Sequence, residues 1–295
     1  MQIHPENTQK IKTIAKDGVN ENYLVQRISK VLIIAYKEST QDLEQLLTSE
    51  GFKTEVLRQE AKPEYQNFSR SYLCLLNHRT AWERAIQEAQ PTMIIEADFV
   101  PVVNFGKLPL PFNPHQSDVG ISWLYTCAPQ IYYISDDGYA EGFSTSTVAY
   151  IVTPQSARYL LELAEEIREQ VGETNYSSWD STIDSFLRNK KLKNYIPWRN
   201  YGEHGGLPNP EHYKNNLSRT HRADVLYGKL AFTPLYAVAV KDSKLSLFWV
   251  RFWARLKGIA RLLTGRFLRV KVLQGSNFPL RLLGFAVLRQ LTLNF

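Results

Sequence analysis

Two carboxylates, Glu96 and Asp98, directly follow a short apolar run, Met93–Ile95. Because a buried charge is unfavourable unless it is paired or bound to a metal, carboxylates at the end of a buried strand need a partner. On an extended backbone, residues two apart point to the same side, so both side chains would face one ligand. A hard divalent cation, Mg²⁺ or Mn²⁺, that bridges a diphosphate fits such oxygen donors. The alternative is a solvated strand end that begins a loop.

The elements that would position this pair alternate along the chain between strand-like and helix-like patterns. Strands are expected over residues 31–35, 54–57, 93–95, 119–126, 131–134 and 147–152, and helices over 42–47, 77–89, 154–169 and 181–187. Asn77 is expected to cap the second helix. The alternation predicts an α/β sandwich with a mostly parallel sheet flanked by helices. Ligands bind at the carboxyl ends of strands in such sheets, which is where Glu96 and Asp98 would lie.

Composition excludes several classes of protein. The chain has 44% hydrophobic and 22% charged residues, as expected for a folded domain and not for a disordered chain. It has two cysteines, Cys74 and Cys127, so a disulfide framework is not expected and a reducing compartment fits better. No apolar run approaches the roughly 20 residues of a membrane-spanning helix. The first residues lack the pattern of a secretory signal, and we expect a cytoplasmic protein.

A resemblance to a known family rests on several segments together. Residues 71–85 contain Asn77 and His78, with Trp82 four residues after the histidine, and the apolar strand that follows ends in Glu96-Ala97-Asp98. Residues 142–157 and the pair Trp179-Asp180 add to the pattern. Over about residues 30–190 the chain resembles glycosyltransferase family 25, the lipopolysaccharide-biosynthesis glycosyltransferases related to collagen galactosyltransferases.

The resemblance implies a GT-A-like, Rossmann-like fold and a specific reaction. A hexose would pass, with inversion, from a nucleotide-sugar, a UDP-sugar in the first instance, to a glycan or glycolipid such as a lipopolysaccharide precursor. Asn77, His78 and Glu96 would contact the nucleotide, and Glu96 and Asp98 would hold Mn²⁺ or Mg²⁺. The chain departs from the family pattern at Asn77, which replaces a serine and should retain helix capping, and at Ala97, which replaces the middle acid of Glu-Asp-Asp.

An inverting reaction also requires a general base within reach of the acceptor hydroxyl. Asp180 is the first candidate, because it precedes a predicted helix and follows Trp179, whose ring could stack on a sugar. The other interpretation of Asp180 is a helix N-cap, to which we give equal weight. Asp184, one turn later, is a weaker candidate for either role.

The glycine-rich stretch 201–208 contains His204, which related GT-A enzymes suggest as a third metal ligand. His221 competes for this role, and the neighbouring Arg222 could pair with a phosphate. A surface histidine without function is the alternative for both. His78 could equally be a packed, hydrogen-bonded core residue.

The charge of the chain is concentrated near its end. Residues 245–295 hold nine Lys/Arg and no Asp or Glu, whereas residues 1–244 hold 26 basic and 29 acidic residues. Apolar residues from Trp249 to Leu263 follow helical spacing, with the basic residues off that stripe. We expect this tail to bind the surface of an anionic membrane. A helix docked on the body is the second interpretation, and nucleic-acid binding is the least favoured.

The sequence thus predicts three regions: an irregular lead-in over 1–27, a GT-A-like domain over 28–240, and a basic aromatic tail over 241–295. The expected partners are a nucleotide-sugar donor, a lipid-linked or polysaccharide acceptor, and the inner face of a membrane, to which the protein would bind peripherally. The competing hypothesis is a non-catalytic relative that binds a nucleotide or a glycan with a decayed acidic motif.

Overall fold

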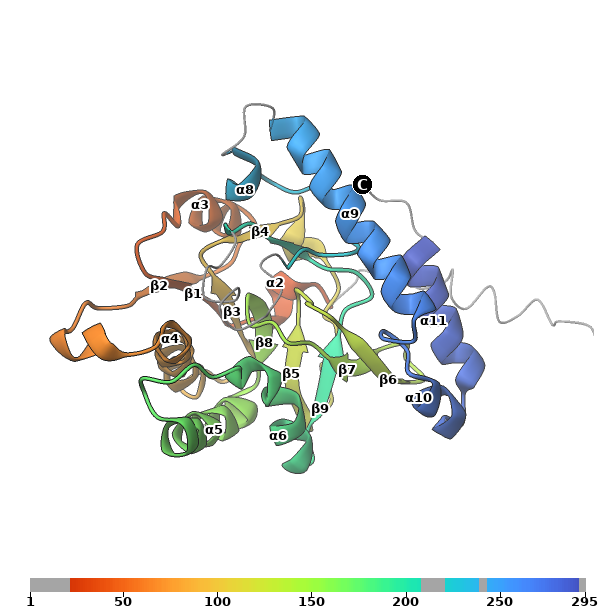
Figure 1. Cartoon of the computed structure of the whole chain (residues 1–295), viewed down its shortest axis with the longest axis horizontal. Helices are drawn as coiled ribbons and strands as arrows, with labels where there is room; N and C mark the ends of the chain where they lie inside the picture. Colours follow the sequence, from red (N-terminus) through yellow and green to blue (C-terminus); the bar gives the residue numbers. More distant parts are fainter. Residues whose placement is uncertain (1–21, 208–220, 239–242, 292–295) are drawn as a thin grey trace, which may run out of the picture.

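The structure, a computed structural model, describes residues 22–207, 221–238 and 243–291. Most of the expected lead-in and the boundary at 240/241 lie outside these residues. The described chain forms two sheets and the helices that cover them (Figure 1). The strands of the large sheet are β1 (Lys30–Ala35), β2 (Thr54–Arg58), β3 (Thr92–Glu96), β5 (Val119–Trp123), β6 (Gln130–Ile134), β7 (Ala140–Phe143), β8 (Ala149–Val152) and β9 (Lys193–Ile196).

These eight strands lie in the order β2-β1-β3-β8-β5-β9-β7-β6. From the pairings, β7 and β8 run opposite to the other six, so the sheet is mostly parallel in direction, as the sequence predicted. The small sheet pairs β4 (Phe99–Pro101) antiparallel with β10 (Gly202–His204). Every strand expected from the sequence is present in the structure.

Alternate residues of the central strands face two separate cores. Leu32 and Ile34 of β1 belong to the core beneath α4 (Arg70–Ala85), α5 (Pro154–Val171) and α6 (Ile183–Asn189). Val31 and Ile33 belong to the core on the opposite face, with residues of α2 (Leu24–Arg27) and α3 (Gln41–Ser49). This burial on both faces explains why β1 and β3 read as continuous apolar runs.

The helix that carries Asn77 and His78 differs from its prediction. It begins at Arg70, seven residues before Asn77, and its N-cap is Ser69, whose side chain accepts a hydrogen bond from the Tyr72 amide. The prediction that Asn77 caps this helix is therefore wrong, because Asn77 lies two turns inside it. Its amide instead donates to Gln59 Oε1 at 3.4 Å.

The basic segment folds into three helices, α9 (Ser243–Leu263), α10 (Val270–Gly275) and α11 (Pro279–Leu291), which follow the short helix α8 (Leu235–Val238). In Figure 1, α9 runs along one side of the molecule, with α10 and α11 beside its C-terminal end. Phe285 of α11 packs edge-on against Trp198, with 4.5 Å between ring centroids. No helix within the described ranges is long and apolar enough to cross a membrane.

Candidate active site

A cleft of about 920 Å³ opens at the carboxyl ends of β1 and β3. Both Glu96, the last residue of β3, and Asp98, in the turn between β3 and β4, line it. The strand ends before Asp98, so the two carboxylates meet the same cleft through a turn and not through one extended backbone. The remaining lining comes from the end of β1, the segment 59–66 after β2, and α4; it is Ile34, Ala35, Tyr36, Glu38, Gln59, Glu60, Ala61, Lys62, Pro63, Tyr65, Gln66, Arg70, Leu73, Cys74, Asn77, His78 and Ala97.

A chain of buried hydrogen bonds holds Glu96. The Tyr150 hydroxyl accepts a bond from Trp82 Nε1–H at 2.9 Å and lies 2.8 Å from His78 Nδ1. Because the carboxylate oxygen of Glu96 can only accept, the hydrogen-bonding pattern places a ring proton on His78 Nε2, and the Tyr150 hydroxyl donates to Nδ1. Nε2 then donates to Glu96 Oε1 at 3.2 Å, and Thr147 Oγ1 donates to the same oxygen at 3.2 Å. His78 is therefore a fully buried, hydrogen-bonded histidine in the wall of the cleft, beside Glu96.

Asp98, which lines the cleft, pairs with His204, which lies outside the lining. His204 Nε2 lies 3.0 Å from Asp98 Oδ2. Burial alone would raise the pKa of Asp98, but the charge and hydrogen bond of His204, with the charge of Arg222, lower it. Burial opposes the charge of His204, yet the neighbouring Asp98 raises its pKa. Asp98 Oδ1 and His204 Nδ1 are both buried and have no hydrogen-bond partner among the described residues. Each of these atoms needs a hydrogen-bond partner, because an unsatisfied buried polar atom is unfavourable.

Of the two histidines that competed for this position, His204 is the one beside Asp98. His221 Nδ1 instead lies 2.8 Å from Cys127 Sγ. Gly206 makes the close approach possible, because a Cβ at this residue would overlap Asp98 Oδ2 and lie 2.9 Å from His204 Nε2. Glycine is thus required here by space and not by backbone conformation.

Asp180 lies in a 3₁₀ turn, η3 (Trp179–Ser181), that precedes α6. Burial raises its pKa to about 6; a hydrogen bond from the Ser181 amide at 2.9 Å opposes this rise, and the negative charge of Glu96 adds to it. Its neighbour Trp179 packs 5.2 Å, centroid to centroid, from His78 in the wall of the cleft, although Asp180 itself is not among the lining residues. A carboxyl with a pKa near neutrality is suited to accept a proton.

Two other residues of the sequence prediction have their polar groups engaged elsewhere. Asp184 is 4% exposed and bonds to Asn194 Nδ2 at 2.9 Å and to the Tyr132 hydroxyl at 3.2 Å. Trp179 is 3% exposed, and its indole N–H donates to the Ser71 carbonyl at 3.0 Å. Its ring is therefore packed and does not present a face to a sugar. Asp184 is a buried carboxyl that joins α6 to Asn194 and Tyr132.

Arg222 spans the loop that carries His204. Its guanidinium donates to the carbonyls of His204 at 2.8 Å and of Gly206 at 2.9 Å, and it lies 4.0 Å from the centroid of the Tyr236 ring. Arg222 therefore holds the backbone of residues 204–206 in place. Its positive charge lowers the pKa of Asp98, but its guanidinium is already bonded to these carbonyls.

One group of potential metal ligands was missed by the sequence analysis. Ligand atoms of Cys74, His78 and Glu96 all lie within 4.8 Å of one another. Burial raises the pKa of the Cys74 thiol well above its ordinary value, which keeps it protonated without a bound cation. The i, i+4 spacing of Cys74 and His78 on one helix was the signal that could have identified the group.

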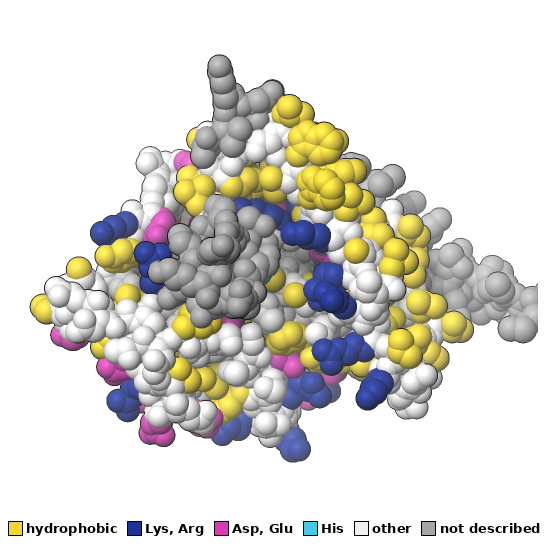
Figure 2. Space-filling model, in the orientation of Figure 1, with side chains coloured by type: hydrophobic (Ala, Val, Ile, Leu, Met, Phe, Trp, Pro, Cys, Tyr) yellow, Lys and Arg dark blue, Asp and Glu magenta, His cyan; other side chains and the backbone are white. Residues whose placement is uncertain are grey.

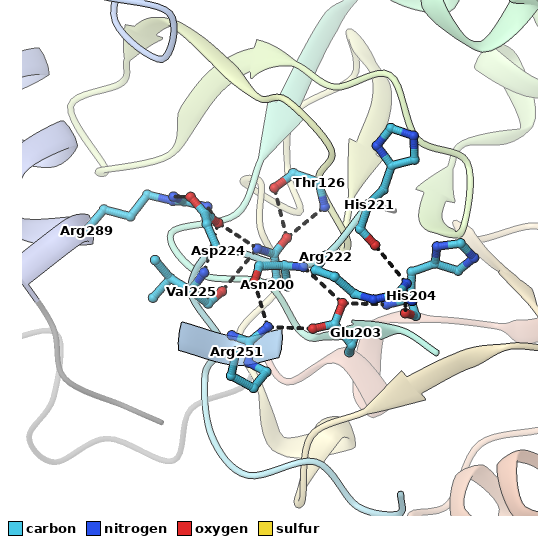
Figure 3. A network of polar contacts seen from close by, with 11 residues as sticks. Thr126, Asn200, Glu203, His204, His221, Arg222, Asp224, Val225, Arg251 and Arg289 are labelled. Carbon is cyan, nitrogen blue, oxygen red and sulfur yellow. Dashed lines mark hydrogen bonds and ion pairs between the residues drawn. The ribbon is translucent and has the colours of Figure 1, made fainter. Parts of the chain in front are cut away.

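The C-terminal helices join the site through buried ion pairs (Figure 3). Glu203, which is fully buried, accepts from the amides of His204 and Ala223 and pairs with Arg251 of α9. Asp224 pairs with Arg289 of α11. Burial would raise the pKa of Asp224, but the charge and hydrogen bonds of Arg289 lower it to about 2. Sequence reasoning had no signal for either pair, whose members lie 48 and 65 residues apart.

No protein-family model and no curated protein sequence matches this chain. Among solved structures it is similar to a glycosyltransferase involved in glycosylation of the major capsid of PBCV-1 (TM-score 0.38, 9% identity, 57% of this chain and 81% of that one). It is also similar to Drosophila β-1,4-galactosyltransferase 7 in complex with manganese, UDP-Gal and xylobiose (0.31, 12%, 58% and 65%), and to an inositol-1-phosphate CTP transferase from T. maritima (0.30, 10%, 57% and 65%). At such TM-scores, the assignment of function rests on the residues of the cleft.

Proposed function

We propose that this chain is a glycosyltransferase that moves a hexose from a nucleotide-sugar, first of all a UDP-sugar, to a glycan or glycolipid acceptor with inversion. The observation that carries the proposal is the presence of Glu96 and Asp98 in one cleft at the carboxyl end of a central strand. In open α/β sheets this is where nucleotide ligands bind. A volume of about 920 Å³ is large enough for a nucleotide-sugar.

The donor would lie with its nucleoside over the end of β1, where Ala35 and Tyr36 line the cleft. Asn77, from the middle of α4, faces the same space, and Lys62 and Arg70 supply positive charge in the lining. The diphosphate would then reach Glu96 and Asp98. Two carboxylates would repel a diphosphate directly, so this placement requires a cation between them.

A divalent cation such as Mn²⁺ or Mg²⁺ would be held by the carboxylate oxygens of Glu96 and Asp98, which line the cleft. His204, whose Nε2 lies 3.0 Å from Asp98 Oδ2, would be the third ligand once the ion replaced that hydrogen bond. The ligand atoms that already lie within 4.8 Å of one another are those of Cys74, His78 and Glu96. When bound, the cation would act as a Lewis acid that neutralises charge on the leaving diphosphate. His78 would hold Glu96 in place, because its Nε2–H occupies Oε1 and leaves Oε2 without a donor among the described side chains.

Asp180 would act as the general base. Its carboxylate would accept the proton of the acceptor hydroxyl as that oxygen attacks the anomeric carbon, and the bond from the anomeric carbon to the diphosphate oxygen would break with its electron pair on the diphosphate. A pKa of about 6 leaves Asp180 mostly ionised at pH 7 and makes it a stronger base than an ordinary aspartate. The Ser181 amide would hold one oxygen and leave the other for the hydroxyl.

The acceptor and location remain those the sequence predicted: a lipid-linked or polysaccharide acceptor, such as a lipopolysaccharide precursor, at the inner face of a membrane. The support for this proposal is the basic aromatic segment after residue 244, which contains no acidic residue. A transferase that works on a lipid-carried glycan benefits from a surface that holds it at the lipid.

The alternative is a non-catalytic relative that binds a nucleotide-sugar or a glycan. Ala97 favours it, since this residue lines the cleft at the position where the family it resembles has a third carboxylate. Donor turnover distinguishes the two: an enzyme hydrolyses or transfers the sugar with Mn²⁺, whereas a binding protein shows saturable binding and no product.

A thermal-shift screen of UDP-sugars with Mn²⁺ tests the proposal. A donor at about 100 times its Kd should stabilise the protein by about 2.7 kcal/mol. The donor-induced shift should disappear in Asp98→Ala and persist in Asp137→Ala, which removes an exposed carboxylate bonded to Asn113 outside the cleft. If no nucleotide-sugar shifts the melting temperature, or if both variants respond like the parent, the cleft is not a metal-dependent donor site.

A further inference from the structure

Helix α9 has three faces with different chemistry. Its inner face, formed by Arg251, Ala254 and Gly258, is buried, and a Cβ at Gly258 would lie 2.7 Å from Asp224 Cβ. The opposite face exposes large apolar side chains. Between the two faces lie basic residues, among them Lys257 and Arg261, whose charges act on Cys127 of the body.

The exposed apolar residues of α9 form one continuous face and are not isolated surface residues. Trp249 is 48% exposed, Trp253 59% and Leu263 81%, and with Leu256 they recur at the three- and four-residue spacing of one helical face. Of the 18 exposed large hydrophobic residues in the described ranges, 12 lie between residues 245 and 291. Figure 2 shows apolar side chains gathered along the outer side of α9. A patch of this kind marks an interaction surface.

Helix α11 repeats the pattern beside α9. Its inner face is buried through Leu282, Phe285 and Arg289, whereas Leu280 is 82% and Leu291 67% exposed. Arg289 of α11 pairs with Asp224, and Arg251 of α9 pairs with Glu203. The charged groups on the inner faces of both helices therefore have partners in the rest of the protein. The outer faces are left without a partner among the described residues. Docking on the body and binding elsewhere are therefore compatible, on opposite faces of the same helices.

The charge of the segment identifies the partner. Residues 245–295 hold nine Lys/Arg and no acidic residue, and Figure 2 shows Lys and Arg side chains in a row between α9 and the centre of the molecule. A second copy of this chain would bring the same positive charge against itself. Nucleic acid would need the cations at the centre of the contact, where this surface has tryptophan and leucine. Aromatic and leucine side chains flanked by cations suit the interface of an anionic bilayer.

We propose that the outer faces of α9 and α11 bind in the plane of an anionic lipid bilayer, with Trp249, Trp253, Leu256 and Leu263 inserted among the headgroups. This deepens the partner proposed above. Lipid binding alone tests this proposal. The protein could therefore fail to bind lipid and still transfer a sugar, or bind lipid without transferring a sugar. Arg251 ties α9 to Glu203, which also holds the His204 amide, so the bound helix stays tied to the strand that carries His204.

Vesicle sedimentation of the full chain tests the proposal. Vesicles that contain phosphatidylglycerol should bind the protein, and pure phosphatidylcholine should bind it at least about tenfold more weakly. Trp249→Ser/Trp253→Ser should weaken binding to the anionic vesicles by about a hundredfold, since each interfacial tryptophan contributes roughly tenfold. Lys257→Gln/Arg266→Gln should weaken it by about 25-fold, fivefold for each exposed cation. Val103→Ser, at an exposed apolar residue outside the face, is the control and should bind like the parent.

Three of the four replaced side chains lie on the outer or flanking surface of α9, and Arg266 is exposed just after that helix. The melting temperatures of both double variants should therefore stay near that of the parent, which separates loss of binding from loss of fold. The proposal is overturned if the parent does not sediment with anionic vesicles, or if the tryptophan variant binds as the parent does. It is also overturned if the tryptophan variant dissociates a dimer of the parent, or if salt-sensitive oligonucleotide binding replaces vesicle binding.

Discussion

Replacing Asp180 with asparagine should abolish transfer and at the same time stabilise the protein. The interpretation of Asp180 as a helix N-cap is wrong, because Thr182 is the N-cap of α6 and Ser178 that of η3. An asparagine side chain retains the oxygen that accepts the Ser181 amide. The substitution therefore removes the ionisable group and little else.

The magnitude follows from the pKa of Asp180. Burial, with a contribution from the charge of Glu96, raises it from 3.8 to about 6. The folded protein thus binds the proton more tightly than the unfolded chain, so stability is highest below pH 4, falls as pH rises toward 6, and is lower by about 3 kcal/mol above that, at 1.36 kcal/mol for each pKa unit. Asp180→Asn should recover much of this near pH 7, which corresponds to a rise in Tm of about 5 °C.

The assay is thermal unfolding of parent and variant between pH 4 and 8, combined with donor turnover at the same pH values. The gap in Tm should open between pH 4 and 6 and stay constant above pH 6, whereas parent activity should be low below pH 6 and high above it, as the folded carboxyl loses its proton. Glu96→Gln removes a negative charge that raises the pKa of Asp180. The pKa of Asp180 should therefore fall, and the loss of stability with rising pH should occur at a lower pH. A variant that is less stable than the parent at pH 7, or that still turns over donor, would refute the assignment of Asp180 as a buried base.

Other substitutions test the parts around this base. Gly206→Ala should weaken Mn²⁺-dependent donor binding at least about tenfold in a titration, because the new methyl group overlaps the carboxylate of Asp98. Arg289→Met should lower the free energy of unfolding in denaturant by about 3–5 kcal/mol, since it leaves Asp224 charged and unpaired. Tyr150→Phe should destabilise the fold by about 1–3 kcal/mol, because it removes a hydrogen bond from the buried imidazole of His78. Since this imidazole orients the carboxylate of Glu96, the variant should also raise the KM for the sugar donor more than it lowers kcat.

The sequence predicted the central strands because their signal is local. The apolar runs that became β1 and β3 are buried on both faces, and burial on both faces is what such runs indicate. The start of α4 was missed for an equally local reason. Ser69 is a good N-cap, but the first turn after it, Arg70 to Leu73, mixes exposed and buried residues without a clear stripe, and the stronger apolar pattern begins later.

The contacts that assemble the site are not local, which is why residue types could be predicted and their pairing could not. The small sheet of β4 and β10 pairs His204 with Phe99, and this register sets the imidazole beside Asp98 across 106 residues of sequence. The same strand carries Glu203 on its other face, where Arg251 of α9 neutralises it. One short strand therefore presents a candidate ligand to the cleft and a buried charge to the C-terminal helices. A change in β10 therefore affects both the pair of His204 with Asp98 and the pair of Glu203 with Arg251. The basic C-terminal segment thus helps to position the residues of the site.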